Sequence, residues 1–223
     1  MSELKLVVFD VDGTLVDSQG DILGAMAAAF AAVDQPAPTR AEILGIVGLS
    51  LPKAVAALAP EQDEHALGQM VEAYKQRYFE LRQSGGAGAS PLYPGIAALL
   101  ERLHQQDELL LGVATGKSRR GLDALLDSLE LRRFFVTTQV ADDHPSKPHP
   151  SMLMTALSEA GVAREHAVMI GDTSYDMDMA RAAGLKAIAV GWGYHPAQAL
   201  AGADRLVQDA VALEAAILEL LEH

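Results

Sequence analysis

The chain has 223 residues, half of them hydrophobic, which is enough for one substantial core or for a core domain with a smaller companion. It contains no cysteine, so disulfide bonds, thiolate metal sites and a thiol nucleophile are excluded. The formal net charge of −13 disfavours sequence-independent binding to nucleic acid or to an anionic membrane surface, because both depend on clustered Lys and Arg.

The N-terminal segment MSELKLVVFDVDGTLV has a short apolar run that ends at an aspartate. It lacks the basic region, long apolar stretch and small-residue cleavage site of a signal peptide. No stretch of the chain approaches the roughly 20 apolar residues that a membrane span needs. We therefore expect a cytoplasmic protein with no membrane partner.

Short, nearly continuous apolar runs recur along the chain and are typical of strands buried on both faces. These expected strands lie at 4–9, 109–114, 134–136, 167–170 and 187–190. Segments with the apolar spacing of helices alternate with them, at 96–105, 119–129, 151–160 and 176–183. The alternation predicts an α/β fold with a Rossmann-like, doubly wound parallel sheet, because parallel strands need right-handed crossovers.

Residues 18–85 contain helical patterns only. The expected helices lie at 22–33, at 41–45, after a cap at Ser50 with Pro52 in the first turn, and at 64–83. This pattern predicts an inserted, small all-helical cap domain at 18–85, with residues 1–17 and 86–223 forming the α/β core domain. The glycine-rich segment SGGAGASP at 84–91 suits a flexible hinge, although a plain surface loop is the alternative.

Asp10 and Asp12 follow the first expected strand, two residues apart. Because side chains alternate along an extended chain, both carboxylates should point to one side, roughly 6–7 Å apart. The carboxyl ends of strands are where ligands bind in such sheets. The alternative is an ordinary Asp-Gly turn with a helix cap at the end of a strand.

Two further signals follow the next two strands. Thr115 and Gly116 precede an expected helix, where a hydroxyl and free N–H groups make an anion site. Lys147 lies in HPSKPHP, whose prolines restrict the backbone, so this lysine could be a fixed phosphate partner. The alternatives are a simple strand-to-helix turn and a solvated surface lysine.

The segment GDTSYD follows another apolar strand. Asp172 stands at the strand end, and Asp176 should lie on the same helix face about 5–6 Å away. Together with Asp10, these two carboxylates could supply the hard oxygen ligands that Mg²⁺ prefers. The alternative is an acidic first turn that favours the helix dipole.

All four signals fall at the carboxyl ends of expected strands, the one edge of the sheet where they can meet. The ordered set DVDGT, Thr115, Lys147 and GDTSYD resembles the motifs of the haloacid dehalogenase-like hydrolase superfamily. The resemblance covers essentially the whole chain, including a helical cap between the first two motifs. The opening FDVDGTLVDS is most similar to the phosphoglycolate phosphatase and β-phosphoglucomutase branch.

This resemblance implies a phosphatase. Asp10 would attack phosphorus to form an aspartyl-phosphate, and Asp12 would protonate the leaving alkoxide and then activate water. The resemblance further implies a Mg²⁺ site formed by Asp10, the backbone carbonyl of Asp12, Asp172 and Asp176. It also implies a phosphate site, in which the phosphoryl oxygens are bound by Thr115, Gly116 and Lys147. True dehalogenases generally lack an aspartate at the position of Asp12, so phosphate esters are favoured over haloacids.

The substrate class is less sharply indicated. We expect small phosphorylated metabolites such as phosphoglycolate, with sugar phosphates, nucleoside monophosphates and pyrophosphate left open, and we expect Ser50 and Lys53 in the cap to select the leaving group. A phosphosugar mutase is the alternative enzyme; similar mutases hold the sugar with a cap arginine and lysine, whereas GLSLPK has Lys53 but no arginine. A binding protein on a non-catalytic scaffold is the third possibility. The sequence does not indicate the oligomeric state.

Overall fold

The computed structural model describes residues 3–85 and 90–222. Its centre is one sheet of six parallel strands in the order β3-β2-β1-β4-β5-β6. The strands are β1 (Lys5–Phe9), β2 (Leu109–Thr115), β3 (Phe135–Val140), β4 (Ala167–Gly171), β5 (Lys186–Val190) and β6 (Arg205–Val207). The chain winds outward from β1 to β3 and then returns to β4 on the other side of β1. The predicted doubly wound, Rossmann-like α/β fold is thereby confirmed.

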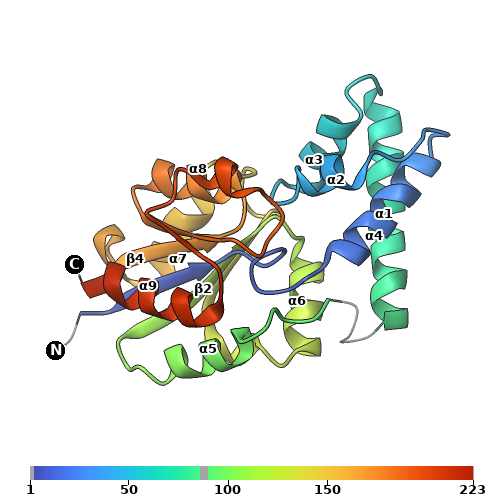
Figure 1. Cartoon of the computed structure of the whole chain (residues 1–223). Helices are drawn as coiled ribbons and strands as arrows, with labels where there is room; N and C mark the ends of the chain where they lie inside the picture. Colours follow the sequence, from blue (N-terminus) through green and yellow to red (C-terminus); the bar gives the residue numbers. More distant parts are fainter. Residues whose placement is uncertain (1–2, 86–89, 223) are drawn as a thin grey trace.

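Helices cover both faces of this sheet (Figure 1). They are α5 (Ile96–His104), α6 (Arg119–Ser128) and α9 (Ala210–Glu222) on one face, and α7 (Ser151–Ala160) and α8 (Ser174–Ala183) on the other. In β1, Val7 and Phe9 belong to the first apolar layer, whereas Leu6 and Val8 belong to the second. All four side chains are fully buried, which explains why this strand is a continuous apolar run.

The remaining helices form a separate group beside the sheet, which we call the helical unit (Figure 1). It consists of α1 (Gln19–Ala31), α2 (Arg40–Leu44), α3 (Leu51–Leu58) and α4 (Glu64–Gly85). The unit has its own apolar cluster, in which Met26, Phe30, Val55 and Met70 are buried together. This cluster supports the expected division into a cap domain and a core domain, which we keep as a proposal. Residues 86–89 of the expected hinge lie outside the described residues.

Three features differ from the sequence-based expectations. β3 runs from Phe135 to Val140 rather than over 134–136, because it includes polar residues that an edge strand tolerates. The structure adds β6, in which only Val207 is buried, so it has no apolar run. It also adds α9, which is apolar around most of its circumference and therefore shows no clear helical spacing. Short 3₁₀ helices lie at η2 (Arg132–Phe134), η3 (Arg164–His166) and η4 (Ala197–Leu200).

Every helix within residues 3–85 and 90–222 is too short or too polar to cross a lipid bilayer.

Candidate active site

The expected site residues come together at the carboxyl edge of the sheet. Asp10 directly follows β1, Thr115 ends β2, and Asp172 follows β4. Asp176 lies in the first turn of α8, and Lys147 lies in the loop between β3 and α7. Each of these five side chains is at most 1% exposed. The sheet order reverses beside β1, so this edge is the point where crossover connections leave room for a ligand.

A buried lysine links two of the carboxylates. Lys147 Nζ donates hydrogen bonds to Asp10 Oδ1 at 2.8 Å and to Asp176 Oδ1 at 2.6 Å. Burial raises the pKa of Asp10 to about 7, against the opposing charge of Lys147. Burial alone would lower the pKa of Lys147, but the charges of Asp10 and Asp176 raise it above its ordinary value. Lys147 therefore stays charged and fixed in position between the two acids.

Asp172 and Asp176 also accept hydrogen bonds from neighbouring backbone and hydroxyl groups. Asp172 accepts a hydrogen bond from the Thr14 hydroxyl at 2.9 Å and one from the Tyr194 N–H at 2.8 Å. Burial and the charges of Asp10 and Asp176 raise the pKa of Asp172 well above its ordinary value. Asp176 Oδ2 accepts from the N–H and the hydroxyl of Thr173, at 3.1 and 2.7 Å, in a capping box that begins α8.

Glycine is required next to Asp172. Gly13 has φ +83°, and a Cβ atom there would lie 2.1 Å from Asp172 Oδ2. A Cβ atom at Gly193 would lie 2.1 Å from the Cβ of Asp172. The backbone thus closes around this carboxylate from two sides, which only glycine permits.

Asp10, Asp172 and Asp176 fit a hard divalent cation. One oxygen from each lies within 4.8 Å of the others, and all three side chains are buried. Asp10 Oδ2 is buried and has no hydrogen-bond partner within residues 3–85 and 90–222, so one carboxylate oxygen of this cluster lacks a compensating donor. A single lysine against three carboxylates leaves the group short of positive charge. Carboxylate oxygens grouped in this way are the ligands that Mg²⁺ binds.

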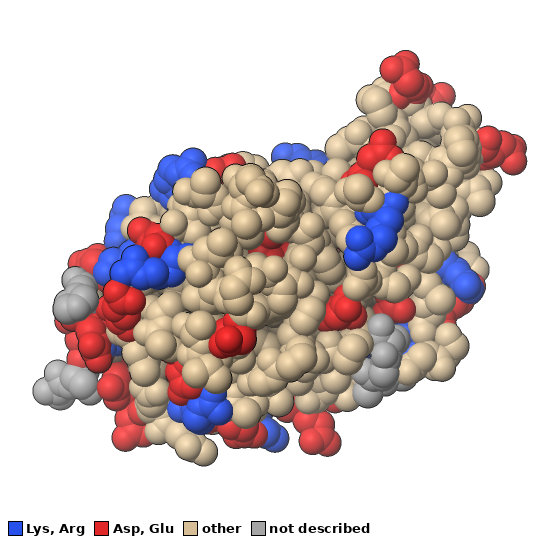
Figure 2. All heavy atoms as spheres, viewed as in Figure 1, with Lys and Arg blue, Asp and Glu red and all other residues tan. Residues whose placement is uncertain are grey.

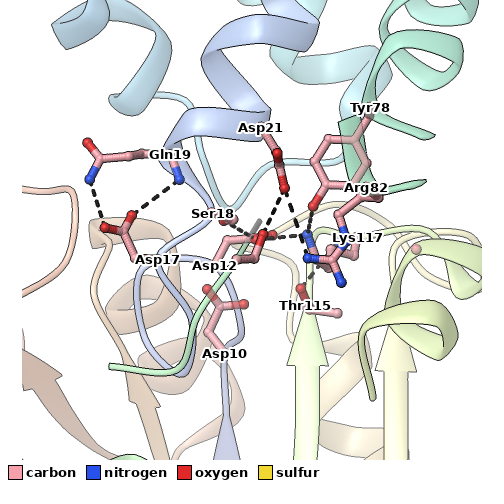
Figure 3. Close-up of polar contacts among 12 residues, drawn as sticks. Asp10, Asp12, Asp17, Ser18, Gln19, Asp21, Tyr78, Arg82, Thr115 and Lys117 are labelled. Atoms are coloured by element: carbon pink, nitrogen blue, oxygen red, sulfur yellow. Dashed lines mark hydrogen bonds and ion pairs between the residues drawn. The ribbon is translucent and has the colours of Figure 1, made fainter. Parts of the chain in front are cut away.

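Asp12 has different partners from the other acids (Figure 3). Its Oδ1 accepts hydrogen bonds from Lys117 Nζ at 2.8 Å and from the Ser18 hydroxyl. Lys117 also donates to the Tyr78 hydroxyl on α4, at 2.8 Å, and Ser18 contacts the Tyr194 hydroxyl at 3.2 Å. The Asp12 carboxylate is therefore tied to the helical unit, and it lies outside the cluster of three acids that could hold a metal.

Lys117, Ser18 and Tyr194 are site residues that sequence reasoning did not single out. Two of them had a usable signal: Ser18 ends the quoted opening FDVDGTLVDS, and Lys117 follows Thr115 by two residues. Tyr194 had none, because it meets Ser18 across 176 residues of chain. Contacts of this kind depend on how the loop after β5 folds back over the site.

The helical unit lies directly against the expected phosphate-binding residues. A Cβ atom at Gly116 would lie 2.7 Å from the backbone oxygens of both Gly48 and Leu49. The Ser50 N–H donates to the Ser146 hydroxyl at 2.8 Å, next to Lys147. Thr115 Oγ1 accepts from the Lys117 N–H at 3.3 Å. The loop that precedes α3 therefore packs directly against the expected phosphate site.

A cavity of about 410 Å³ lies between the helical unit and the carboxyl edge of the sheet. Asp10, Asp12 and Thr115 form part of its wall on the sheet side, and Ser50 lies on the side of the helical unit. Lys53, the other expected specificity residue, is exposed and does not line this cavity. A substrate that fills the cavity would touch Ser50 but not Lys53.

Comparison with known proteins identifies the family. Residues 7–190 match the haloacid dehalogenase-like hydrolase family. A protein named "Probable phosphatase IndB" from Dickeya dadantii is 36% identical over 205 residues, covering 89% of this chain and 86% of that protein. A phosphoglycolate phosphatase from Pseudomonas syringae pv. tomato is 30% identical over 225 residues, covering 96% of this chain and 82% of that protein.

Solved structures agree with these relatives. The crystal structure of a predicted phosphatase from Clostridium acetobutylicum has a TM-score of 0.85 and 26% sequence identity, covering 98% of this chain and all of that one. The family match begins within β1 and ends with β5, so it includes every acidic residue gathered at the sheet edge. The chain therefore belongs to the haloacid dehalogenase-like hydrolases.

Proposed function

We propose that this hydrolase is a Mg²⁺-dependent phosphatase that acts on small phosphate monoesters, such as phosphoglycolate, through an aspartyl-phosphate. The observation that carries the proposal is the hydrogen bonding of the Asp10 carboxylate at the cavity wall. One of its carboxylate oxygens accepts from Lys147 at 2.8 Å, and the other is buried with no hydrogen-bond partner in the described part of the chain. A second carboxylate, Asp12, lines the same cavity and can serve a different role.

In the first step, a carboxylate oxygen of Asp10 attacks phosphorus and the bond from phosphorus to the leaving oxygen breaks. Protonated Asp12 gives its proton to that oxygen, so the alcohol leaves neutral. In the second step, Asp12 takes a proton from water as the water attacks phosphorus. The bond between phosphorus and Asp10 then breaks, which releases inorganic phosphate and restores both acids.

Charge compensation is the main demand of this reaction. Mg²⁺, held by Asp10, Asp172 and the backbone carbonyl of Asp12 with Asp176 in support, would supply positive charge that lets an anionic nucleophile meet an anionic ester. Lys147 adds a fixed positive charge at Asp10. The Thr115 hydroxyl and the Gly116 N–H would bind the phosphoryl oxygens and orient the ester for in-line attack.

The lysine on which the phosphosugar mutase alternative relied, Lys53, lies outside the cavity. A non-catalytic binding protein gains no support from the structure, since such a role gives no reason to bury Asp10 at the cavity wall with Asp172 and Asp176 grouped beside it.

The test is phosphate release from a panel of phosphate monoesters, with Mg²⁺ or with a chelator, by the wild type and by Asp10→Asn. We expect release to need Mg²⁺ and to fall on the order of 10⁴-fold or more in Asp10→Asn, because the nucleophile is lost. Asp178→Asn is the matched control, since Asp178 is a half-exposed residue of α8 paired with Arg181. When the reaction is quenched with acid, an ester labelled on phosphorus should leave labelled phosphate bound to the wild type but not to Asp10→Asn. Turnover that survives in Asp10→Asn contradicts the proposal.

A further inference from the structure

One face of α4 forms a wall of the cavity. Tyr74, Tyr78 and Arg82 follow each other at intervals of four residues, which places them on the same side of the helix. All three line the cavity. The two tyrosine rings are stacked with centroids 5.9 Å apart, and the guanidinium lies one turn further along. The wall therefore changes from aromatic to cationic along its length.

One donor of Arg82 has no hydrogen-bond acceptor among the residues that the structure describes. The side chain is 12% exposed, and this donor, Nη1, is buried. Nη1 forms an ion pair with Asp21 Oδ2 at 4.0 Å, which is too long for a hydrogen bond, and that oxygen already accepts from the Ser90 hydroxyl at 2.9 Å. Nη2 donates to the Ser128 hydroxyl at 3.1 Å, which fixes the orientation of the guanidinium. A buried, oriented donor without an acceptor costs stability unless a ligand supplies the acceptor.

Other cavity residues add to the positive charge. Arg120 lies 4.3 Å above the Phe79 ring and forms no ion pair with any residue that the structure describes. Both residues line the cavity. The cavity lining holds four cationic residues, Lys75, Arg82, Lys117 and Arg120, against three aspartates, Asp10, Asp12 and Asp142. In a protein with a net charge of −13, this small local excess of positive charge favours an anionic ligand.

The position of the leaving group follows from Asp12. Asp12 must reach the leaving oxygen, and Lys117 connects Asp12 to the Tyr78 hydroxyl through two hydrogen bonds of 2.8 Å (Figure 3). The body of the alcohol therefore extends from Asp12 along the α4 face. A hydrogen-bond acceptor on the alcohol that lies about one helical turn beyond Tyr78 would contact the guanidinium of Arg82.

We propose that Arg82, assisted by Arg120, binds a carboxylate on the leaving group, and that the preferred substrates are carboxylate-bearing phosphate monoesters with an apolar body that packs on Tyr74 and Tyr78. This proposal rests on the proposed phosphatase function. It goes further because it names the residue that recognises the leaving group. It also extends the substrate class beyond phosphoglycolate, because a cavity of about 410 Å³ is in the range of sites for larger ligands.

The test compares 4-carboxyphenyl phosphate with 4-nitrophenyl phosphate, two esters of nearly equal shape that differ by one negative charge. Their chemical reactivities differ, but that difference cancels when each variant is compared with the wild type. We expect Arg82→Gln to lower kcat/KM for the carboxylate ester roughly 10- to 100-fold more than for the nitro ester. Arg82→Lys should restore part of the loss, and Arg120→Gln should show a smaller effect of the same sign.

Arg77→Gln is the matched control. Arg77 also lies on α4, but it pairs with Glu80 at 3.2 Å and does not line the cavity, so both esters should be hydrolysed as by the wild type. An equal loss for both esters in Arg82→Gln, or no loss, overturns the proposal, because a purely structural arginine would not distinguish the two.

Binding separates this proposal from the proposed function. The affinity of both esters is measured by calorimetry in Asp10→Asn protein, with and without Arg82→Lys or Arg82→Gln. Tighter binding of the carboxylate ester that is lost with Arg82 supports the proposal even if no ester is hydrolysed. If the wild type hydrolyses both esters while Arg82 makes no difference to either binding or turnover, the phosphatase stands and the carboxylate site is wrong.

Discussion

Lys117 received no role from the sequence, and the structure places it beside Asp12. Its ammonium is buried between Asp12 and the Tyr78 hydroxyl, with a hydrogen bond of 2.8 Å to each. Burial opposes the charge, but Asp12 and Tyr78 together raise the pKa of Lys117 above its ordinary value, so it stays protonated. A fixed cation of this kind orients the Asp12 carboxylate toward the cavity rather than toward solvent.

We predict that Lys117→Met lowers kcat/KM for alkyl phosphates about 10- to 100-fold, because a misplaced Asp12 protonates the leaving oxygen poorly. The loss should be much smaller for 4-nitrophenyl phosphate, whose leaving group needs little protonation. Steady-state kinetics with both substrates check the prediction. Lys5→Met is the control, since Lys5 begins β1 at the opposite edge of the sheet. Equal losses for both substrates would mean that Lys117 acts on binding and not through Asp12.

At the residue scale, the sequence predicts which acids gather but not how they are held. Strand ends are visible as apolar runs, so the common location of Asp10, Asp172 and Asp176 follows from the pattern alone. The pairing of Lys147 with Asp10 and Asp176 spans 137 and 29 residues of chain. No local spacing encodes contacts of that range, since they depend on tertiary packing. The catalytic and metal-binding roles assigned to these residues stay predictions until the variants are measured.

At the scale of elements, the loop between α2 and α3 makes close backbone contacts with the core that add to the side-chain contacts of α4. The Gly45 carbonyl accepts from the Tyr175 hydroxyl and from His195 Nε2, both at 3.2 Å. The Ser174 N–H donates to His195 Nδ1 at 3.2 Å, so Nε2 carries the ring proton. Gly116 faces the same loop at Gly48 and Leu49. Close backbone contact here determines how the cavity is closed.

Gly116→Ala should therefore open the junction. The added Cβ would stand 2.7 Å from two backbone oxygens, which cannot move as a flexible side chain can. We expect kcat/KM to fall about 10- to 100-fold through misplacement of the helical unit, and amides of the loop that precedes α3 to exchange faster with deuterium. Hydrogen exchange followed by mass spectrometry measures the second effect.

Gly68→Ala is the control for this variant. Gly68 lies within α4, and a Cβ there would have no atom within 4 Å, so this substitution should leave activity unchanged and stabilise the helix by about 0.5–1 kcal/mol. If Gly116→Ala shows the activity and the amide hydrogen exchange of the wild type, the loop can move aside without loss of function, and the junction is not a fixed contact.

The elements themselves were largely predictable, and the junction was not. The helices of the helical unit follow from apolar spacing and caps, such as Pro52 in the first turn of α3. β6 escaped prediction because two of its three residues are exposed. The junction depends on backbone atoms of Gly45, Gly48 and Leu49, and backbone contacts leave no side-chain pattern in a sequence.

At the scale of the whole molecule, the distribution of charge is uneven. Acidic and basic side chains are interspersed over the surface seen in Figure 2. The interior, by contrast, holds the three carboxylates of the expected metal site against one lysine. Ionising these acids in the folded protein is unfavourable without further positive charge, so stability should depend on pH and on divalent cations.

The direction of this dependence follows from Asp10. Its pKa is about 7 in the folded, metal-free protein and 3.8 ordinarily, because burial disfavours the ionised form. Between about pH 4 and 7, the folded state therefore keeps a proton that the unfolded state has lost. The free energy of unfolding then falls as the pH rises through this window, and the contribution of Asp10 is fully present only below it. Asp172, whose pKa is also raised by burial, acts in the same direction.

We predict that metal-free wild type loses stability relative to Asp10→Asn as the pH rises from 4.5 to 8, since the variant carries no charge at this position. Urea unfolding of both proteins in chelator, at half-unit pH steps, measures the difference. Adding Mg²⁺ at pH 8 should stabilise the wild type more than the variant, because an ion that binds only the folded state adds to stability. A difference between the two proteins that is constant with pH would show that Asp10 is already ionised at pH 4.5, and that Lys147 alone compensates its charge.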